Sequence, residues 1–137
     1  GKSCAPLLKN PNSEFRTEIF AEQSDHGYVL NRRGVRNKQY LYINNFAENK
    51  HSCLLEAQPM AKELVKAFHD KKLNRDQLLC FDPHPPVEEL YDVQADPLAL
   101  HNVVDDPALG AVRDAMRQKL LQQAKNTEDA VYLQTAR

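Results

Sequence analysis

Residues 17–46 read TEIFAEQSDHGYVLNRRGVRNKQYLYINNF and carry the clearest strand signals of the chain. Three runs within this stretch have the aromatic and β-branched composition that is typical of strands. These runs are residues 17–21, 28–30 and 40–43. The polar residues 37–39 indicate a tight turn, so residues 28–46 are predicted to form a hairpin. The stretch therefore predicts an antiparallel pair of strands with a third strand beside it.

Downstream, the spacing of apolar residues changes from the period of a strand to that of a helix. Apolar side chains four residues apart predict an amphipathic helix that begins at Pro59 and ends near residues 71–72. They are Met60, Leu64 and Phe68. Residues 74–77 have the pattern of a capping box and predict one further helical turn, which the proline-rich residues 82–86 bring to an end.

The last third of the chain supplies one returning strand and one long helix. Residues 87–93 contain a short strand, and Asp106 with Pro107 forms a cap and first-turn pair for a helix over residues 107–125. The apolar stripe of this helix is Leu109, Val112, Met116 and Leu120. Residues from 126 onward show little periodicity and are expected to fray. The order of elements predicts one α+β domain, with a small antiparallel sheet of about four strands and a long C-terminal helix packed on it.

The charge balance and the hydropathy argue against two kinds of partner. The chain of 137 residues has 18 Lys and Arg against 19 Asp and Glu, which gives a formal net charge of −1. A nucleic-acid surface is typically marked by an excess of cations, and none is present. No apolar run approaches the ~20 residues that span a bilayer. We therefore expect neither a nucleic-acid partner nor a membrane partner.

The cysteines give no sign of a metal site. Cys4, Cys53 and Cys80 lie far apart and lack zinc-site spacing, so we expect three free thiols, with Cys80 acting as a small buried hydrophobic residue. Cys4 has no neighbouring base in the sequence that would activate it as a nucleophile. Residues 6–8, which follow shortly after it, are expected to form a turn packed on the core.

Ser24, Asp25 and His26 stand next to one another, and adjacent residues cannot converge as a catalytic triad. They lie between two strand runs and precede Gly27, which indicates a loop at the edge of the sheet. An imidazole and a carboxylate on such a loop suit hydrogen bonding to a polar ligand as well as they suit a turn. Both interpretations remain open from the residues alone.

Arg32, Arg33 and Arg36 form the densest basic cluster of the chain. On a strand, positions 32 and 36 share one face and position 33 takes the other. Planar guanidinium groups bind carboxylate, sulfate and phosphate with two hydrogen bonds, so an oxyanion contact is one interpretation. The alternative is an ordinary salt bridge, for which the available carboxylates are Glu88, Glu89 and Asp92.

Five segments, read in order, resemble one family of enzymes. Residues 1–8 match a Gly-x-Ser-x-x-Pro-Leu-Leu segment, and residues 20–26 begin with its Phe-Ala-Glu motif. Residues 33–46 match a hairpin that ends in Tyr-Ile-x-Asn-Phe, and residues 85–97 contain Glu-Glu-Leu-Tyr-Asp with a downstream Asp-Pro. Residues 101–107 match the segment that precedes the last helix of the family. Together they resemble the C-terminal subdomain of a sulfatase, most closely the branch that includes heparan N-sulfatase (sulfamidase).

This resemblance implies a domain division and a missing catalytic centre. Residues 1–16 would end the catalytic-domain segment, and residues 17–137 would form the α+β subdomain, with a four-stranded antiparallel sheet and a helix against it. Sulfatases use a formylglycine, made from the Cys or Ser of Cys/Ser-x-Pro-Ser-Arg, and a divalent cation, usually calcium, in the larger N-terminal domain. Cys4 is followed by Ala-Pro-Leu-Leu and does not fit that motif. The piece is therefore expected to hold no cofactor or metal and to be inactive alone.

For the parent protein, the resemblance implies a sulfuric ester or sulfamate hydrolase that acts on a sulfated carbohydrate such as a glycosaminoglycan, and that is exported from the cytoplasm. The subdomain would pack on its own N-terminal catalytic domain through the sheet face and the closing helix, and would form one wall of the substrate cleft. The implied substrate-binding residues are His26, its neighbour Asp25 and, more weakly, Arg33. The alternative is a free-standing, non-catalytic binding or packing module. In either case an exposed apolar docking patch is expected to favour self-association.

Overall fold

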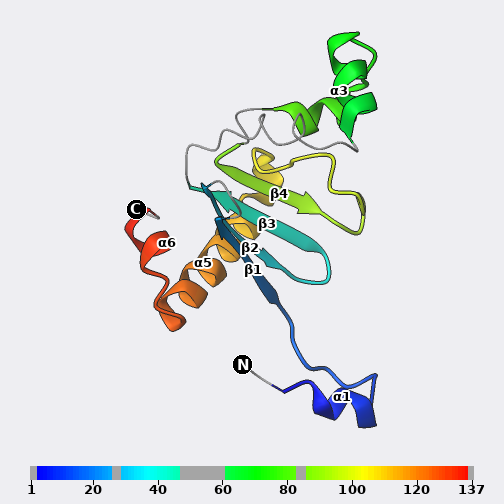
Figure 1. The fold of residues 1–137 in the computed structure, drawn as a ribbon. Coiled ribbons are helices and arrows are strands. Elements are labelled where there is room, and N and C mark those ends of the chain that lie inside the picture. The colour runs from blue at the N-terminus through cyan, green and yellow to red at the C-terminus, as the bar shows by residue number, and fades with distance from the viewer. Residues whose placement is uncertain (1–2, 26–28, 47–60, 83–85, 136–137) are drawn as a thin grey trace.

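The computed structural model describes residues 3–25, 29–46, 61–82 and 86–135. Its centre is a four-stranded antiparallel sheet with the strand order β1-β2-β3-β4 (Figure 1). The strands are β1 (Ile19–Asp25), β2 (Val29–Arg36), β3 (Tyr40–Asn45) and β4 (Glu88–Asp92). One long helix lies across one face of this sheet. The predicted α+β class and the small antiparallel sheet are confirmed.

The turn between β2 and β3 is built by one side chain. The Oδ1 atom of Asn37 accepts hydrogen bonds from the backbone N–H groups of Gln39 at 2.8 Å and Tyr40 at 2.6 Å. The backbone N–H of Asn37 also donates to the carbonyl of Tyr40 at 3.0 Å. Asparagine suits such turns because its short side chain bonds the backbone two residues on. The predicted hairpin and its polar turn are confirmed.

The outer edge of β4 is covered by the chain that follows it. The backbone N–H of Leu90 donates to Oδ1 of Asn102 at 2.9 Å, and the N–H of Val103 donates to the carbonyl of Leu90 at 2.8 Å. The Asn102 amide also donates to the carbonyl of Glu88 at 3.2 Å. These contacts satisfy backbone groups that an edge strand leaves unpaired.

The long helix α5 (Gly110–Asn126) supplies the second layer of the core. It follows the 3-10 turn η3 (Pro107–Leu109), which Asp106 caps by accepting from the N–H of Ala108 at 2.9 Å. Its buried residues pack on the sheet, and the core they form contains Val35, Tyr42, Leu90, Val104, Met116, Leu120, Ala124 and Tyr132. The predicted cap, helix and apolar stripe are confirmed.

A helical segment follows the undescribed residues after β3 and lies beyond β4 (Figure 1). Its elements are α3 (Lys62–His69), α4 (Arg75–Leu78) and η2 (Leu79–Phe81). The capping box is confirmed, since Asn74 and Gln77 exchange side-chain and backbone hydrogen bonds. Phe68 stacks on Phe81 with ring centroids 4.2 Å apart. Cys80 is exposed, not buried as predicted, because the ring of Phe81 makes the packing contact of this turn. Pro59, Met60 and Cys53 lie outside the described residues.

The C-terminal residues do not fray as predicted. They form α6 (Ala130–Thr135), whose Tyr132 is 2% exposed and lies within the core. The ring of Tyr132 packs against that of Phe46 with centroids 5.0 Å apart. The prediction was wrong because it rested on local periodicity, whereas this short helix is held by tertiary contacts.

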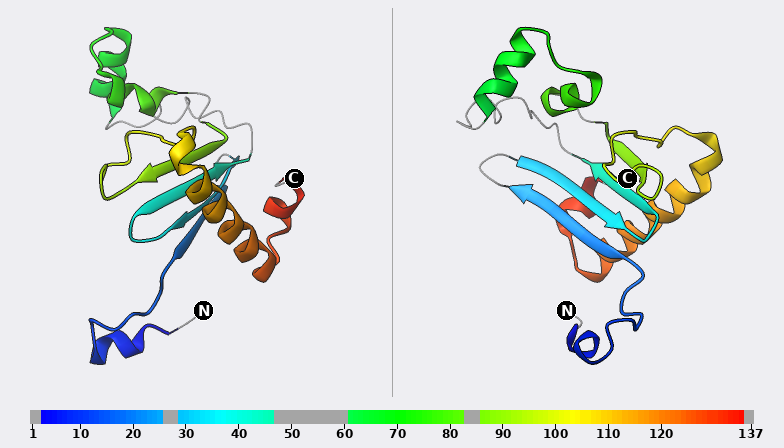
Figure 2. Two further views of the ribbon diagram at one scale, coloured as in Figure 1. Left: turned by 180° about the vertical axis from the view of Figure 1, so that it is seen from behind. Right: turned by 90° about the vertical axis from the view of Figure 1, so that its right-hand side faces the viewer.

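The N-terminal helix α1 (Ala5–Lys9) stands apart from the sheet in both views of Figure 2. It has no buried residue, and Leu8 is 88% exposed. The predicted turn packed on the core is therefore wrong, because this segment is helical and reaches no core among the described residues. Among the described residues, no helix combines the length and the hydrophobicity that a membrane-spanning segment needs.

Candidate functional site

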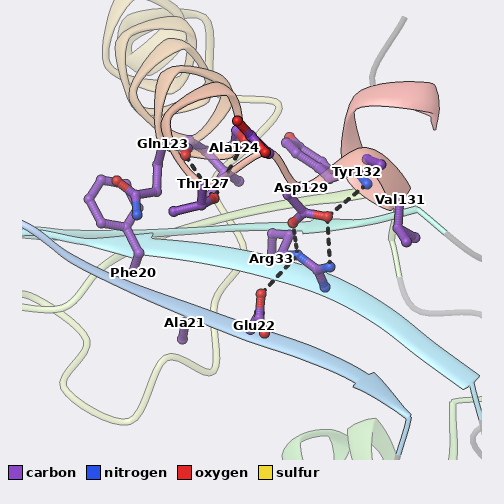
Figure 3. Close-up of a pocket in the computed structure, with 13 residues that line it drawn as sticks. Phe20, Ala21, Glu22, Arg33, Gln123, Ala124, Thr127, Asp129, Val131 and Tyr132 are labelled. Atoms are coloured by element: carbon purple, nitrogen blue, oxygen red, sulfur yellow. Dashed lines mark hydrogen bonds and ion pairs between the residues drawn. The ribbon is translucent and has the colours of Figure 1, made fainter. Parts of the chain in front are cut away.

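A groove of about 660 Å³ runs between β1 and the end of the helical layer (Figure 3). We call it the Arg33 groove, since the side chain of Arg33 lies at its floor. The side chains that Figure 3 places around it come from β1, β2 and the α5–α6 region. They include Phe20, Glu22, Gln123, Asp129 and Val131.

The strand register directs Arg33 toward the helices. Arg33 lies opposite Glu22 of β1 and Asn44 of β3, and Val35, two residues on, is buried on the same face. Arg33 itself is 6% exposed. Arg32 lies on the other face of the strand, since side chains alternate along it. The predicted division of the arginines between two faces agrees with this register.

Arg33 is held by a two-point ion pair with Asp129. Its Nε donates to Oδ2 of Asp129 at 2.6 Å, and its Nη2 donates to Oδ1 at 3.2 Å. Its Nη1 donates to the carbonyl of Arg32 at 3.0 Å. Glu22, which is largely exposed, lies 3.8 Å from Nε. The guanidinium is thus neutralised from within the chain, and its geometry is fixed.

The pKa of Asp129 is lowered chiefly by the hydrogen bond from Arg33, while burial acts in the opposite direction. The second function of Asp129 is to begin α6, because its Oδ1 also accepts from the backbone N–H of Tyr132 at 3.1 Å. An aspartate three residues before a helical N–H is a typical N-cap. This carboxylate therefore joins the last helix to the centre of β2.

Glu88 and Glu89, two of the carboxylates considered as salt-bridge partners of the arginine cluster, bind other residues and not Arg33. Glu88 accepts from Nε and Nη2 of Arg117 at 2.7 and 2.6 Å. Glu89 accepts from Nδ2 of Asn45 at 2.6 Å. Neither carboxylate faces Arg33, because β4 lies two strands away from β2 in the sheet order.

The Glu88–Arg117 pair includes a buried phenol. Tyr42, which is fully buried, donates its hydroxyl to Glu88. The hydrogen bond from Arg117 lowers the pKa of Glu88, and burial raises the pKa of Tyr42. Because all three groups are paired, this cluster ties α5 to the sheet and presents no free reactive group.

The end of the β1–β2 hairpin carries a distortion. Gln23 lies opposite Arg32, but Asp25 lies opposite Val29, so β2 contains one more residue than β1 between these pairs. Asn31 lies in this extra stretch with a φ of 33°. An extra residue of this kind is a β-bulge, which bends the strand and changes the direction of neighbouring side chains.

Of the three predicted site residues, the structure describes the backbone position of Asp25 and the side chain of Arg33. Asp25 ends β1 opposite Val29, and the positions between them, His26 included, lie outside the described residues. Arg33 is four positions along β2 from Val29, which is roughly 13 Å in an extended strand. Arg33 also faces the helices and pairs with Asp129. The substrate-binding assignment of His26, Asp25 and Arg33 therefore stays a prediction.

Sequence reasoning missed Asp129 and Arg117, the two residues that organise the charges. Arg33 and Asp129 are 96 residues apart, and no local pattern links them. The one available signal was the N-cap spacing from Asp129 to Tyr132, which could have indicated α6. In the described ranges, no group of three or more His, Cys, Asp or Glu side chains could hold a metal ion. The described residues therefore do not fit a sulfatase cation site.

The fold has a solved counterpart. The chain aligns over 94% of its length with a structure of BT4656 in complex with its substrate, D-glucosamine-2-N,6-O-disulfate. The TM-score is 0.59 at 16% sequence identity, and the match covers 20% of that protein's chain. At this identity the likeness establishes a shared fold.

Sequence comparison finds two relatives that belong to one class of enzyme. The chain is 34% identical over 79 residues to one ulvan-active sulfatase of Formosa agariphila, and 26% identical over 121 residues to another. These alignments cover 55% and 85% of the chain, which spans only 13% and 22% of the relatives' lengths. No protein-family model matches. The resemblance to sulfatases is thus confirmed, while the heparan N-sulfatase branch stays a prediction.

Proposed function

We propose that this chain is the C-terminal subdomain of a sulfatase that hydrolyses sulfuric esters or sulfamates on a carbohydrate. The observation that carries the proposal is the sequence similarity to a second ulvan-active sulfatase, which extends over 85% of the chain. The parent enzyme would hold its formylglycine and divalent cation, calcium by the resemblance, in an N-terminal catalytic domain. The formylglycine carries the covalent chemistry there, and this chain supplies packing and substrate contacts.

The hairpin end between β1 and β2 is the part we assign to one wall of the substrate cleft. Its support is the β-bulge at Asn31, since bulges occur often beside active sites and redirect side chains there. His26 and Asp25 would donate to and accept from sulfate or sugar hydroxyls at this end. Arg33 acts as a positioning residue, because Asp129 already neutralises its charge.

The substrate class is a sulfated carbohydrate. The matched relatives are active on ulvan by name, and the structural counterpart binds a disulfated glucosamine as its substrate. These are sulfated sugars, so ulvan and glycosaminoglycan fragments are the two substrate classes to compare. A parent enzyme that acts on either would have to meet its polymer outside the cytoplasm.

The decisive experiment starts from the coding sequence upstream of residue 1. A Cys/Ser-x-Pro-Ser-Arg motif in the same reading frame is expected, and the full-length protein should release sulfate from 4-nitrophenyl sulfate, ulvan or N,6-O-disulfated glucosamine. Substitution of the motif Cys or Ser by alanine should abolish turnover. A reading frame without the motif, together with an inactive protein, would favour the free-standing packing module instead.

A further inference from the structure

The β-bulge of β2 is a strained point of the backbone. Asn31 has a φ of 33°, in the left-handed region that residues other than glycine rarely adopt. Such a conformation persists only where the surrounding structure holds it in place. Asn31 lies one residue before Arg32, at the hairpin end that we assign to the substrate cleft. The contacts that hold the backbone at Asn31 therefore decide how that end is oriented.

The first of these contacts comes from the beginning of α6. Arg33 donates from Nη1 to the carbonyl of Arg32, the residue next to Asn31, at 3.0 Å. Figure 3 shows the carboxylate of Asp129 holding the same guanidinium with both oxygens. Asp129 also accepts from the backbone N–H of Tyr132 in α6. A continuous series of hydrogen bonds thus connects α6 to the residue that follows the bulge.

The second contact also leads back to α6. The backbone N–H of Phe46, which follows β3, donates to the carbonyl of Asn31 at 3.0 Å. The ring of Phe46 packs against that of Tyr132, which is itself buried in the core. The helix α6 is therefore connected to two successive carbonyls of β2, to that of Asn31 through ring packing and to that of Arg32 through an ion pair.

The guanidinium of Arg33 joins the two connections. Its Cζ lies 5.2 Å from the centroid of the Phe46 ring, which is a cation–π distance. One side chain thus contacts both the ring of the second connection and the carboxylate of the first. A change at either Asp129 or Tyr132 is therefore expected to disturb the same group.

The ion pair has a geometric role that apolar packing cannot supply. A buried pair adds little net stability compared with apolar residues of the same volume, but it can fix one arrangement of its side chains. Apolar side chains at positions 33 and 129 would fill the same space. They would leave the carbonyl of Arg32 without the hydrogen bond from Arg33.

We propose that Asp129 and Tyr132 are positioning residues of the parent sulfatase, and that α6 uses them to hold the bulge at Asn31. By this connection α6 fixes the orientation of the hairpin end assigned to the substrate cleft. The inference rests on the proposed function and names the residues that orient the assigned wall. Because Asp129 and Tyr132 act through other residues, we expect them to affect the binding of the sugar more than the chemical step.

Two substitutions in the full-length parent protein interrupt the two connections separately. Asp129→Asn removes the partner charge of Arg33, and Tyr132→Leu removes the ring that packs on Phe46. Met116→Ala is the matched control, because Met116 is 2% exposed and contacts the turn at the other end of β2. It should lower the stability by leaving a cavity there, without a change at the bulge.

Residue-resolved hydrogen exchange measures the state of the bulge directly, because the N–H of Phe46 is bonded to the carbonyl of Asn31. Relative to the amides of β3, this amide is expected to exchange about tenfold faster in both variants, and at the wild-type ratio in Met116→Ala. If Asp129→Asn does not fold, the double substitution Arg33→Met with Asp129→Leu interrupts the same connection without leaving a buried charge.

Kinetics with two kinds of substrate test the positioning role. For a sulfated sugar, ulvan or N,6-O-disulfated glucosamine, KM is expected to rise by about threefold to tenfold in both variants, with little change in kcat. For 4-nitrophenyl sulfate, which has no sugar ring, KM should stay unchanged. Met116→Ala should leave both KM values at those of wild type.

Three results would contradict these expectations in distinguishable ways. An unchanged exchange ratio at Phe46 in both variants overturns the inference. Faster exchange with an unchanged KM for the sugar also overturns it, since α6 would then serve stability alone. With an active wild-type enzyme, both results leave the proposed function standing. A wild-type protein without sulfatase activity overturns the proposed function, and the positioning role with it.

Discussion

Asp129→Asn is expected to destabilise the chain by about 3 kcal/mol, because it leaves the guanidinium of Arg33 buried without its partner charge. The two side chains are only 7% and 14% exposed, so water screens the pair little. Glu22, 3.8 Å away and largely exposed, can replace part of the lost charge, which places the cost at the low end of the usual range.

The expected change in melting midpoint follows from chain length. An unfolding entropy of about 2.1 cal/mol/K per residue gives roughly 0.29 kcal/mol/K for this chain, so the midpoint should fall by about 10 °C. Circular dichroism on heating measures the midpoint, and hydrogen exchange of residues 130–135 reports whether α6 opens first. The adjacent, exposed Glu128 supplies the matched control, since Glu128→Gln makes the same chemical change outside the ion pair.

A third variant separates the ion pair from general damage. The double substitution Arg33→Met with Asp129→Leu removes both charges and should recover much of the stability, since buried pairs can be replaced by apolar groups. Asp129→Leu also removes the N-cap hydrogen bond from the backbone N–H of Tyr132, which lowers the stability by about 1 kcal/mol. An Asp129→Asn midpoint equal to that of Glu128→Gln would refute the reasoning.

The same ion pair has a pH dependence of defined sign. Arg33 lowers the pKa of Asp129 below its ordinary value of 3.8 in the folded chain. The pair therefore contributes fully at pH values above that ordinary value, and its contribution is lost as the pH falls through the lowered folded pKa. The stability difference between wild type and Asp129→Asn should be constant near neutrality and should shrink in acid below about pH 4.

Three further predictions concern the intact enzyme and the isolated chain. In the parent enzyme, His26→Ala should raise KM more than it lowers kcat and cost about 1–3 kcal/mol in kcat/KM, whereas unchanged kinetics with a lower melting midpoint would assign His26 to the turn. Residues 1–137 alone should not hydrolyse 4-nitrophenyl sulfate, and turnover that Cys4→Ala abolishes would contradict the assignment of the nucleophile to another domain. In ultracentrifugation the isolated chain should self-associate through its uncovered apolar surface, and a strictly monomeric chain with a cooperative, high-temperature melt would count against that surface.

The elements that the sequence predicted correctly are those specified by neighbouring residues. The Asn37 turn, the Asn74 capping box and the Asp106 cap each depend on hydrogen bonds within a few positions. The aromatic and β-branched composition of β3 and the apolar stripe of α5 are equally local signals. Such elements can be predicted without knowledge of the tertiary structure, because the residues that form their hydrogen bonds lie within one short segment.

The errors concern contacts between distant parts of the chain. The helix α6 has weak periodicity and is stabilised by burial of Tyr132 and by the link from Asp129 to Arg33. The partner of Arg33 was sought in β4, but the strand order places β4 two strands from β2. The side chain of His26 lies in a stretch that the structure does not describe, so the most specific functional prediction still depends on kinetics.

The covered edge of β4 limits how the isolated chain can polymerise. Because Asn102 and Val103 already occupy backbone groups of Leu90, a foreign strand finds β1 as the edge of the described sheet available for addition. Two copies joined edge to edge through β1 would present a covered β4 at each end of one eight-stranded ribbon. Growth by strand addition would then stop at a pair of chains, whereas a sheet with two free edges could extend into a fibre.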